Sequence, residues 1–306
     1  MFKQVAEIQS DVWEKLHQIH SSKKVGTAYC LSGPPGCGKE GLALTFGALI
    51  NCESADSFPG CGCSSCLRFQ TLQHEHLSLV VPLPATTKKS EQDISTKNIE
   101  ILNSELDKKK QDLFHKIRVP SANRIILQSI HKLKKSLMLR SSVFGRKTAI
   151  ILDADLLCVG AGESANALLK LLEEPPPLTT IILVTDFKDK LFSTLISRCQ
   201  HVHVPKLSNG SIQNMLKAKG IEPDKIKWVS CLSGGNFTTA CELSSRKWEE
   251  VRKTLNLFSD LLSKNDHKNL IKFASEYSKL SFTDKTEFRF HFYMFQRWLL
   301  SVFRLQ

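Results

Sequence analysis

The sequence predicts an α/β fold, in which helices flank a parallel sheet that carries a phosphate-binding loop, followed by a helical C-terminal part. Three observations lead to this prediction. A glycine-rich loop at 33–40 lies between an apolar stretch and a helical pattern. Two further apolar runs, 148–153 and 180–185, alternate with helical patterns, as the strands of a parallel sheet do. After Pro205 the pattern changes to helices only.

The composition is that of a soluble chain with two or three domains. Its 306 residues carry a net charge of +12, which suits either a neighbouring anionic polymer such as nucleic acid or a lysine-rich soluble surface. The sequence contains no run of 18 apolar residues, so no membrane partner is expected. The ten cysteines occur without an apolar export signal near the N-terminus, which predicts a cytoplasmic location and reduced thiols.

The first elements frame the loop. An amphipathic stripe predicts a helix over 1–24, and 28–32 is predicted to be a short strand that leads into the loop. The next predicted helix, 41–50, directs its N-terminus at the loop, as phosphate sites require. A further strand is predicted at 77–81.

The middle of the chain begins with an insertion over 83–116. Lysine and acidic residues dominate it and few large apolar residues precede Ile99, so we expect it to be exposed and partly helical over 99–114. A lysine-rich amphipathic helix is predicted over 125–139. The helix predicted over 163–174 ends at a run of three prolines, which cannot continue it.

The loop at 33–40 fits the phosphate-binding pattern at every position but the last. The pattern requires glycines whose backbone N–H groups wrap phosphates, a lysine that reaches the outer phosphates, and a hydroxyl that binds Mg²⁺. Lys39 supplies the lysine, but Glu40 replaces the hydroxyl and argues against Mg²⁺ binding. The loop is therefore either a nucleotide site or a remnant kept for its shape. The candidate residues are Gly33, Pro34, Pro35, Gly36, Cys37, Gly38, Lys39 and Glu40.

A second requirement of ATP hydrolysis is an acid at the end of a buried strand, followed by a glutamate that activates water. Asp153 fits the first role, but Ala154 stands where the glutamate is expected and cannot take a proton. Asp155 would point to the other side of an extended strand. Two compromised positions predict little hydrolysis. An active ATPase would need Glu40 to bind Mg²⁺ directly and Asp155 to replace the glutamate.

Three motifs resemble those of AAA+ clamp-loader subunits: the helix Asn166–Pro176, the triplet Ser197-Arg198-Cys199 and the lead-in Ala28–Gly36. The resemblance covers residues 1–205 apart from the insertion, and 206–245 weakly. Within this family the chain looks like the delta-prime type of bacterial DNA polymerase III.

The resemblance implies three domains. The first is an AAA+ nucleotide-binding-like domain over 1–205, with a zinc module at 52–66 and the insertion at 83–116. A small helical lid over 206–247 and a short helical, collar-like domain over 248–306 would follow. This last part ends in an aromatic-rich stretch, which is typical of a core or an oligomer interface.

The resemblance also implies a role. The chain would support ATP-dependent loading of the sliding clamp onto primed DNA during replication without hydrolysing ATP itself. Thr238 takes the place of the sensor-2 arginine of motor subunits, and Thr185 matches the sensor-1 region. Arg198 would act in trans as an arginine finger on a neighbour's ATP; the alternative for this residue is a local ion pair.

The implied partners are gamma/tau-type and delta-type clamp-loader subunits, the sliding clamp and, through the assembled complex, primer-template DNA. ATP or ADP in the loop is left open. The alternative function is an ATP-hydrolysing motor subunit of the gamma/tau type or another AAA+ ATPase.

Four cysteines form a candidate metal site. Cys52, Cys61, Cys63 and Cys66 fall within 15 residues, and four thiolates suit a tetrahedral Zn²⁺ ion in a structural role. Clamp-loader subunits carry a similar module, with one residue more between the second and third cysteines. The alternatives are free thiols, or His74 or His76 in place of one ligand.

Overall fold

The structure is a computed structural model that describes residues 1–84, 96–139, 143, 145–263 and 267–303. The chain divides into two compact units. Unit 1 comprises 1–212 and 235–238, and unit 2 comprises 213–234 and 239–306. The predicted boundaries of the lid and collar-like domains remain predictions.

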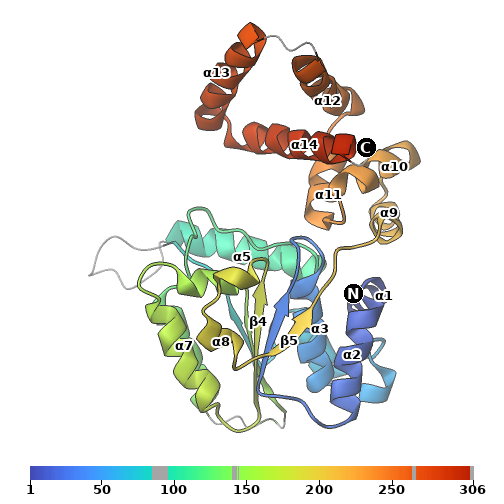
Figure 1. Cartoon of the computed structure of the whole chain (residues 1–306). Helices are drawn as coiled ribbons and strands as arrows, with labels where there is room; N and C mark the ends of the chain where they lie inside the picture. Colours follow the sequence, from blue (N-terminus) through green and yellow to red (C-terminus); the bar gives the residue numbers. More distant parts are fainter. Residues whose placement is uncertain (85–95, 140–142, 144, 264–266, 304–306) are drawn as a thin grey trace. The chain divides into compact units, whose positions relative to one another are not determined.

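A five-stranded parallel sheet forms the centre of unit 1 (Figure 1). Its strands lie in the order β2-β3-β4-β1-β5. They span Leu77–Val80 (β2), Lys147–Ile151 (β3), Thr179–Thr185 (β4), Ala28–Ser32 (β1) and Gln200–His203 (β5). Every neighbouring pair is parallel, which confirms the predicted α/β class. The sequence had not predicted β5, because this edge strand is largely exposed and carries no apolar run.

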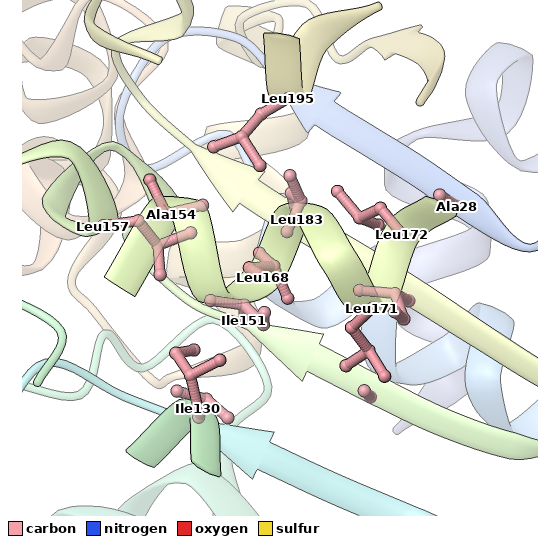
Figure 2. Packing of buried hydrophobic residues seen from close by; sticks show 14 of the residues in the cluster. Ala28, Ile130, Ile151, Ala154, Leu157, Leu168, Leu171, Leu172, Leu183 and Leu195 are labelled. Atoms are coloured by element: carbon pink, nitrogen blue, oxygen red, sulfur yellow. The ribbon is translucent and has the colours of Figure 1, made fainter. Parts of the chain in front are cut away.

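Helices cover both faces of the sheet. On one face, Leu168, Leu171 and Leu172 of α7 (Glu163–Glu173) pack against Ile151 and Leu183, as Figure 2 shows. The same core includes α6 (Leu127–Met138).

On the opposite face, the Tyr29 ring meets Phe46 of α3 (Lys39–Ile50) edge-on, with ring centres 5.3 Å apart. Successive residues of a strand point to opposite faces, so one apolar strand supplies both cores.

The N-terminal segment forms two helices instead of the single predicted one. α1 (Phe2–Ile8) and α2 (Ser10–Ser21) are separated at Gln9. The buried Gln9 amide donates hydrogen bonds to the carbonyl oxygens of Cys37, at 2.8 Å, and Pro205, at 3.0 Å. The break therefore ties the N-terminus to the phosphate-binding loop, which an amphipathic stripe could not reveal.

The described part of the insertion is partly helical, as predicted, but it is only partly exposed. Residues 85–95 lie outside the described part, and α5 (Thr96–Gln111) follows them. Lys109 is only 1% exposed, and Leu113 just after the helix is equally buried. The segment packs onto the phosphate-binding loop, so its lysines serve the interior as well as the surface.

Unit 2 is helical, as predicted for the residues after Pro205. Its helices are α10 (Pro223–Ser233), most of α9 (Asn209–Ala218) and α11 (Phe237–Ser244), and α12 (Trp248–Ser263), α13 (His267–Thr283) and α14 (Lys285–Phe303). The Tyr293 hydroxyl of α14 donates to the carbonyl of Leu232 at 2.6 Å and joins early and late parts of the unit. Among the described residues, no helix is both long and apolar enough to cross a membrane.

Candidate functional site

The phosphate-binding loop joins the carboxyl end of β1 to the N-terminus of α3. Gly36 and Gly38 have φ values of 67° and 90°, which side chains other than glycine rarely allow. A Cβ atom on Gly36 would lie 1.8 Å from Oδ1 of Asn236, so the close approach of the 235–238 segment also requires glycine. The loop thus has its expected strand–loop–helix setting.

Lys39, the lysine of the phosphate-binding pattern, contacts the protein itself. The Nζ atom of Lys39 lies 2.6 Å from Oδ1 of Asp186 and donates to the carbonyl oxygens of Gly33, at 2.9 Å, and Pro34, at 2.6 Å. An ammonium group has three donors, and these contacts use them all. Lys39 is 4% exposed, so it is held inside the loop in place of reaching outward for a phosphate.

A second ammonium group bridges two carboxylates. Nζ of Lys116 lies 2.8 Å from Oδ1 of Asp153 and 2.9 Å from Oδ2 of Asp186. Burial opposes the charge of Lys116, but the two aspartates outweigh burial and raise the pKa of Lys116. Burial likewise opposes the charge of Asp186, whose pKa the two lysines nevertheless lower. Burial raises the pKa of Asp153, because Lys116 offsets it only in part.

Glu40 is paired as well. Its Oε2 atom lies 2.6 Å from Nζ of Lys109, which also donates to the carbonyl oxygens of Leu113, at 2.8 Å, and His115, at 2.6 Å. The carboxylate that replaces the Mg²⁺-binding hydroxyl is therefore neutralised by a lysine from the insertion.

Little space is left in this pocket. Its volume is about 30 Å³, between the loop, Asp153, Thr185, Thr238 and the 109–116 segment. A water molecule needs roughly 10–15 Å³ on this measure, and pockets for small ligands have roughly 300–1,000 Å³. In this conformation the pocket admits water but not a nucleotide.

Asp155 and Thr185 are joined by a hydrogen bond between their side chains. The Thr185 hydroxyl donates to Oδ1 of Asp155 at 2.7 Å and accepts the N–H of Phe187 at 2.9 Å. Asp155 is buried, but it does not continue the extended strand as the sequence predicted, because β3 ends at Ile151 and residues Ala154–Cys158 form a 3-10 helix. Asp153 itself has a φ of 46°, a left-handed conformation that is costly outside glycine and tends to occur at functional sites.

Arg198 lies apart from this pocket, just after α8 (Ser193–Ile196). Its guanidinium contacts Oε1 of Glu173 at 2.5 Å and donates to the carbonyl of Thr194 at 2.9 Å. The local ion pair expected as the alternative therefore exists in the single chain. Its side chain is 36% exposed, so the guanidinium is accessible from outside.

The four predicted cysteine ligands come together. The Sγ atoms of Cys52, Cys61, Cys63 and Cys66 all lie within 4.8 Å of one another. A tetrahedral ion with Zn–S distances of about 2.3 Å needs sulfur atoms roughly 3.8 Å apart, and Cys52 lies 4.0 Å from Cys63 and 3.5 Å from Cys66. The cluster can hold a metal such as zinc.

The local fold helps one of these thiols, Cys63, to ionise, whereas burial raises the pKa of Cys52 to about 11 and also raises the pKa of Cys66. Cys63 is the N-cap of α4 (Ser64–Gln70), where its sulfur accepts the N–H of Cys66. Burial opposes ionisation, but N–H groups directed at the sulfur lower the pKa of Cys63 to about 7. The alternative ligands are engaged elsewhere, since His74 contacts the Ser65 hydroxyl at 3.0 Å and His76 contacts the Val143 carbonyl at 3.2 Å.

His74 gives a testable pH dependence. Burial lowers the pKa of His74 to about 4. In the unfolded chain it titrates near 6.5, so between these values the unfolded state binds more protons. The contribution of His74 to the free energy of unfolding is therefore fully present above about pH 6.5. Between about pH 6.5 and 4 it falls by about 1.4 kcal/mol per pH unit. Urea unfolding of the wild type and His74→Gln at pH 7 and 5.5 checks this, and the variant should show the shallower loss.

His131→Gln is the matched control, because His131 is exposed on α6. Equal pH slopes for His74→Gln and the wild type would remove His74 as the cause.

Three residues of the pocket escaped prediction from the sequence. Asp186 directly follows the predicted strand that ends at Thr185, and the carboxyl edge of a parallel sheet is where ligand-site residues gather. That signal could have found Asp186. Lys109 and Lys116 had no such signal, because their positions depend on how the insertion packs.

The sheet and the loop at its carboxyl edge define the class, a P-loop protein with the AAA+ fold. More narrowly, the chain belongs to the DNA polymerase III delta subunit family of clamp-loader proteins, whose family model matches residues 8–208.

Relatives agree with this assignment. DNA polymerase III subunit delta' of Bacillus subtilis is 27% identical over 268 residues, covering 87% of this chain and 69% of that protein. Subunit delta' of Escherichia coli is 24% identical over 79% of this chain and 62% of its own length. Subunit tau of B. subtilis is 27% identical over 67% of this chain but only 29% of its own length.

Among solved structures, a DNA polymerase III gamma subunit-related protein of Thermotoga maritima covers 92% of this chain and 76% of its own, with 18% identity and a TM-score of 0.40. This likeness is too distant to bear on function.

Proposed function

We propose that this chain is a delta-prime-type clamp-loader subunit, which hydrolyses no ATP and lends Arg198 to the ATP of a neighbouring subunit. Its partners would be gamma/tau-type and delta-type subunits in the cytoplasm, and through them the sliding clamp and primer-template DNA. The similarity to the two delta' subunits supports this role. Zn²⁺ on the four cysteines would stabilise the fold and take no part in chemistry.

The observation that carries the proposal is the closed pocket. Lys39 contacts Asp186 and the carbonyl oxygens of its own loop, within a volume of about 30 Å³. Productive phosphate transfer needs this lysine on the outer phosphates and a free acid that holds Mg²⁺. Both groups are engaged here, and Ala154 has no base to offer.

The alternative is a motor subunit of the gamma/tau type, which the similarity to subunit tau favours. It would require Glu40 to leave Lys109, and Asp155 to leave Thr185 and turn toward the loop. Since Asp155 is buried in a 2.7 Å hydrogen bond, this second change would disturb the end of β4.

A direct assay separates the two functions. We expect the purified chain to release no phosphate from Mg²⁺-ATP above the rate of Lys39→Ala, because neither protein places a lysine on the outer phosphates. Phosphate release and the fluorescence of a labelled ATP analogue are measured side by side, with circular dichroism confirming that the variant is folded. Steady turnover that depends on Lys39 would instead assign the motor function.

A further inference from the structure

In the pocket at the phosphate-binding loop, the charged side chains neutralise one another. Three carboxylates and three ammonium groups face one another in it: Glu40, Asp153 and Asp186, with Lys39, Lys109 and Lys116. Each ammonium lies within 2.9 Å of a carboxylate oxygen. A bound nucleotide with its metal would have to displace these pairs, and buried charges that lose their partners are costly.

Lys116 occupies a distinctive place among the three. It alone bridges two carboxylates, at 2.8 and 2.9 Å, and both follow strand ends at the carboxyl edge of the sheet. The acid at that edge is the one that holds Mg²⁺ in P-loop enzymes, and hard divalent cations prefer carboxylate oxygens. Among side-chain groups, an ammonium most resembles such an ion, because it is a compact positive charge that can contact several carboxylate oxygens.

Packing fixes the position of Lys116. Glu105 of α5 accepts hydrogen bonds from Nε2 of His115, at 2.9 Å, and from the backbone N–H of Arg118, at 3.1 Å. Phe114 lies against Gly38 so closely that a Cβ on that glycine would be 2.6 Å from its ring. The residues on both sides of Lys116 are therefore anchored, and its ammonium is directed into the pocket.

We infer that Lys116 is a built-in replacement for the divalent cation of the nucleotide site, so that the pocket is a masked cation site which the chain fills with its own side chain. The inference rests on the pocket part of the proposed function and is independent of Arg198. It gives the insertion a role: the ammonium groups of the 109–116 segment pair with carboxylates of the loop and of the ends of β3 and β4.

Removing the ammonium tests this. In Lys116→Ala the carboxylates of Asp153 and Asp186 lose their bridging cation, and we expect the chain to bind one Mn²⁺ there at least tenfold more tightly than the wild type. Because a ligand that binds only the folded state stabilises it, Mn²⁺ should also raise the melting temperature of this variant. Mn²⁺ titration calorimetry and thermal melts of the zinc-loaded chain measure both effects.

The controls locate the bound ion. Lys110→Ala removes a partly exposed lysine paired with Asp107 and should leave Mn²⁺ binding at the wild-type level. Adding Asp153→Asn to Lys116→Ala should abolish the new site. If Lys116→Ala is unfolded alone, Mn²⁺ should restore its helical circular dichroism.

Two outcomes overturn the inference: a folded Lys116→Ala that binds Mn²⁺ no better than the wild type, and an unfolded one that Mn²⁺ does not rescue. Failure of the proposed function would look different, because ATP turnover by the wild-type chain contradicts that function and says nothing of Mn²⁺ in the variant.

Discussion

A loader reconstituted with Arg198→Ala is expected to hydrolyse ATP about 10³-fold more slowly at the neighbouring site, the lower end of the effect of arginine fingers in other NTPases. The guanidinium suits this role because it is always charged and can contact two phosphate oxygens at once. In the described part of the chain it contacts the exposed Glu173 carboxylate and the Thr194 carbonyl. DNA-stimulated phosphate release by the complete complex measures the loss.

The fold of the variant should be unaffected. An ion pair between partly exposed side chains contributes roughly 0–1 kcal/mol, so the melting temperature of Arg198→Ala should stay close to that of the wild type. Arg198→Lys keeps the positive charge but not the planar guanidinium that contacts two oxygens at once. It should therefore recover only part of the rate of ATP hydrolysis. Glu173→Gln removes the local pair and should leave the complex active. A full rate with Arg198→Ala would exclude the finger.

The parts of the fold that sequence predicts well are those with one dominant physical signal. β1, β3 and β4 are buried on both faces, so each is a largely apolar run. At the loop edge, β1 ends in Ser32 and β4 in Thr185, and Asp153 follows β3. β5 has no such signal, because it is an exposed edge strand held by pairing with β1. The break at Gln9 was also unpredictable, since it depends on two carbonyl groups far away in the sequence.

The same reasoning explains what was predicted of the site. Lys39 and Asp153 follow from local patterns, and the four cysteines follow from their spacing. Lys109 and Lys116 come from a segment whose lysine-rich composition is typical of a solvated surface. Lys109 is buried and Lys116 is half-buried, because they pair with the carboxylates of Glu40, Asp153 and Asp186. Such pairing of charges distant in the sequence leaves no periodic pattern.

The closed pocket and the accessible Arg198 are related under the proposed function, because a fixed pocket would help to position the arginine. Under that function, a loop that needs no nucleotide for its structure would keep one conformation throughout a neighbour's ATP cycle. Arg198, which lies in the same domain just before β5, would then be held in a fixed position relative to that neighbour. Such preorganisation matters because misplacing a catalytic group by about 1 Å can cost roughly 100-fold in rate.

Loss of the metal site at the cysteine cluster is expected to lower the stability of the protein strongly. Cys66→Ser is expected to reduce the zinc content from one ion per chain to none and to melt the 52–70 region. Structural zinc contributes roughly 10–16 kcal/mol in small zinc-binding domains, comparable with the whole stability of a typical domain, about 5–15 kcal/mol. Cys66 is 2% exposed, and the neighbouring Phe69 is fully buried, so loss of the metal opens part of the core.

Zinc content by mass spectrometry of the metal and thermal melts of the purified chain measure this effect, with Cys231→Ser as the control. Cys231 is an exposed thiol of α10 outside the cluster, so its replacement should change neither value. A variant that keeps one zinc ion after Cys66→Ser would show that the metal is held by other groups. Unchanged melting after zinc loss would show instead that the Ser65 hydroxyl, which donates to the Asn51 carbonyl at 2.6 Å, and the packing of Phe69 hold α4 without the metal.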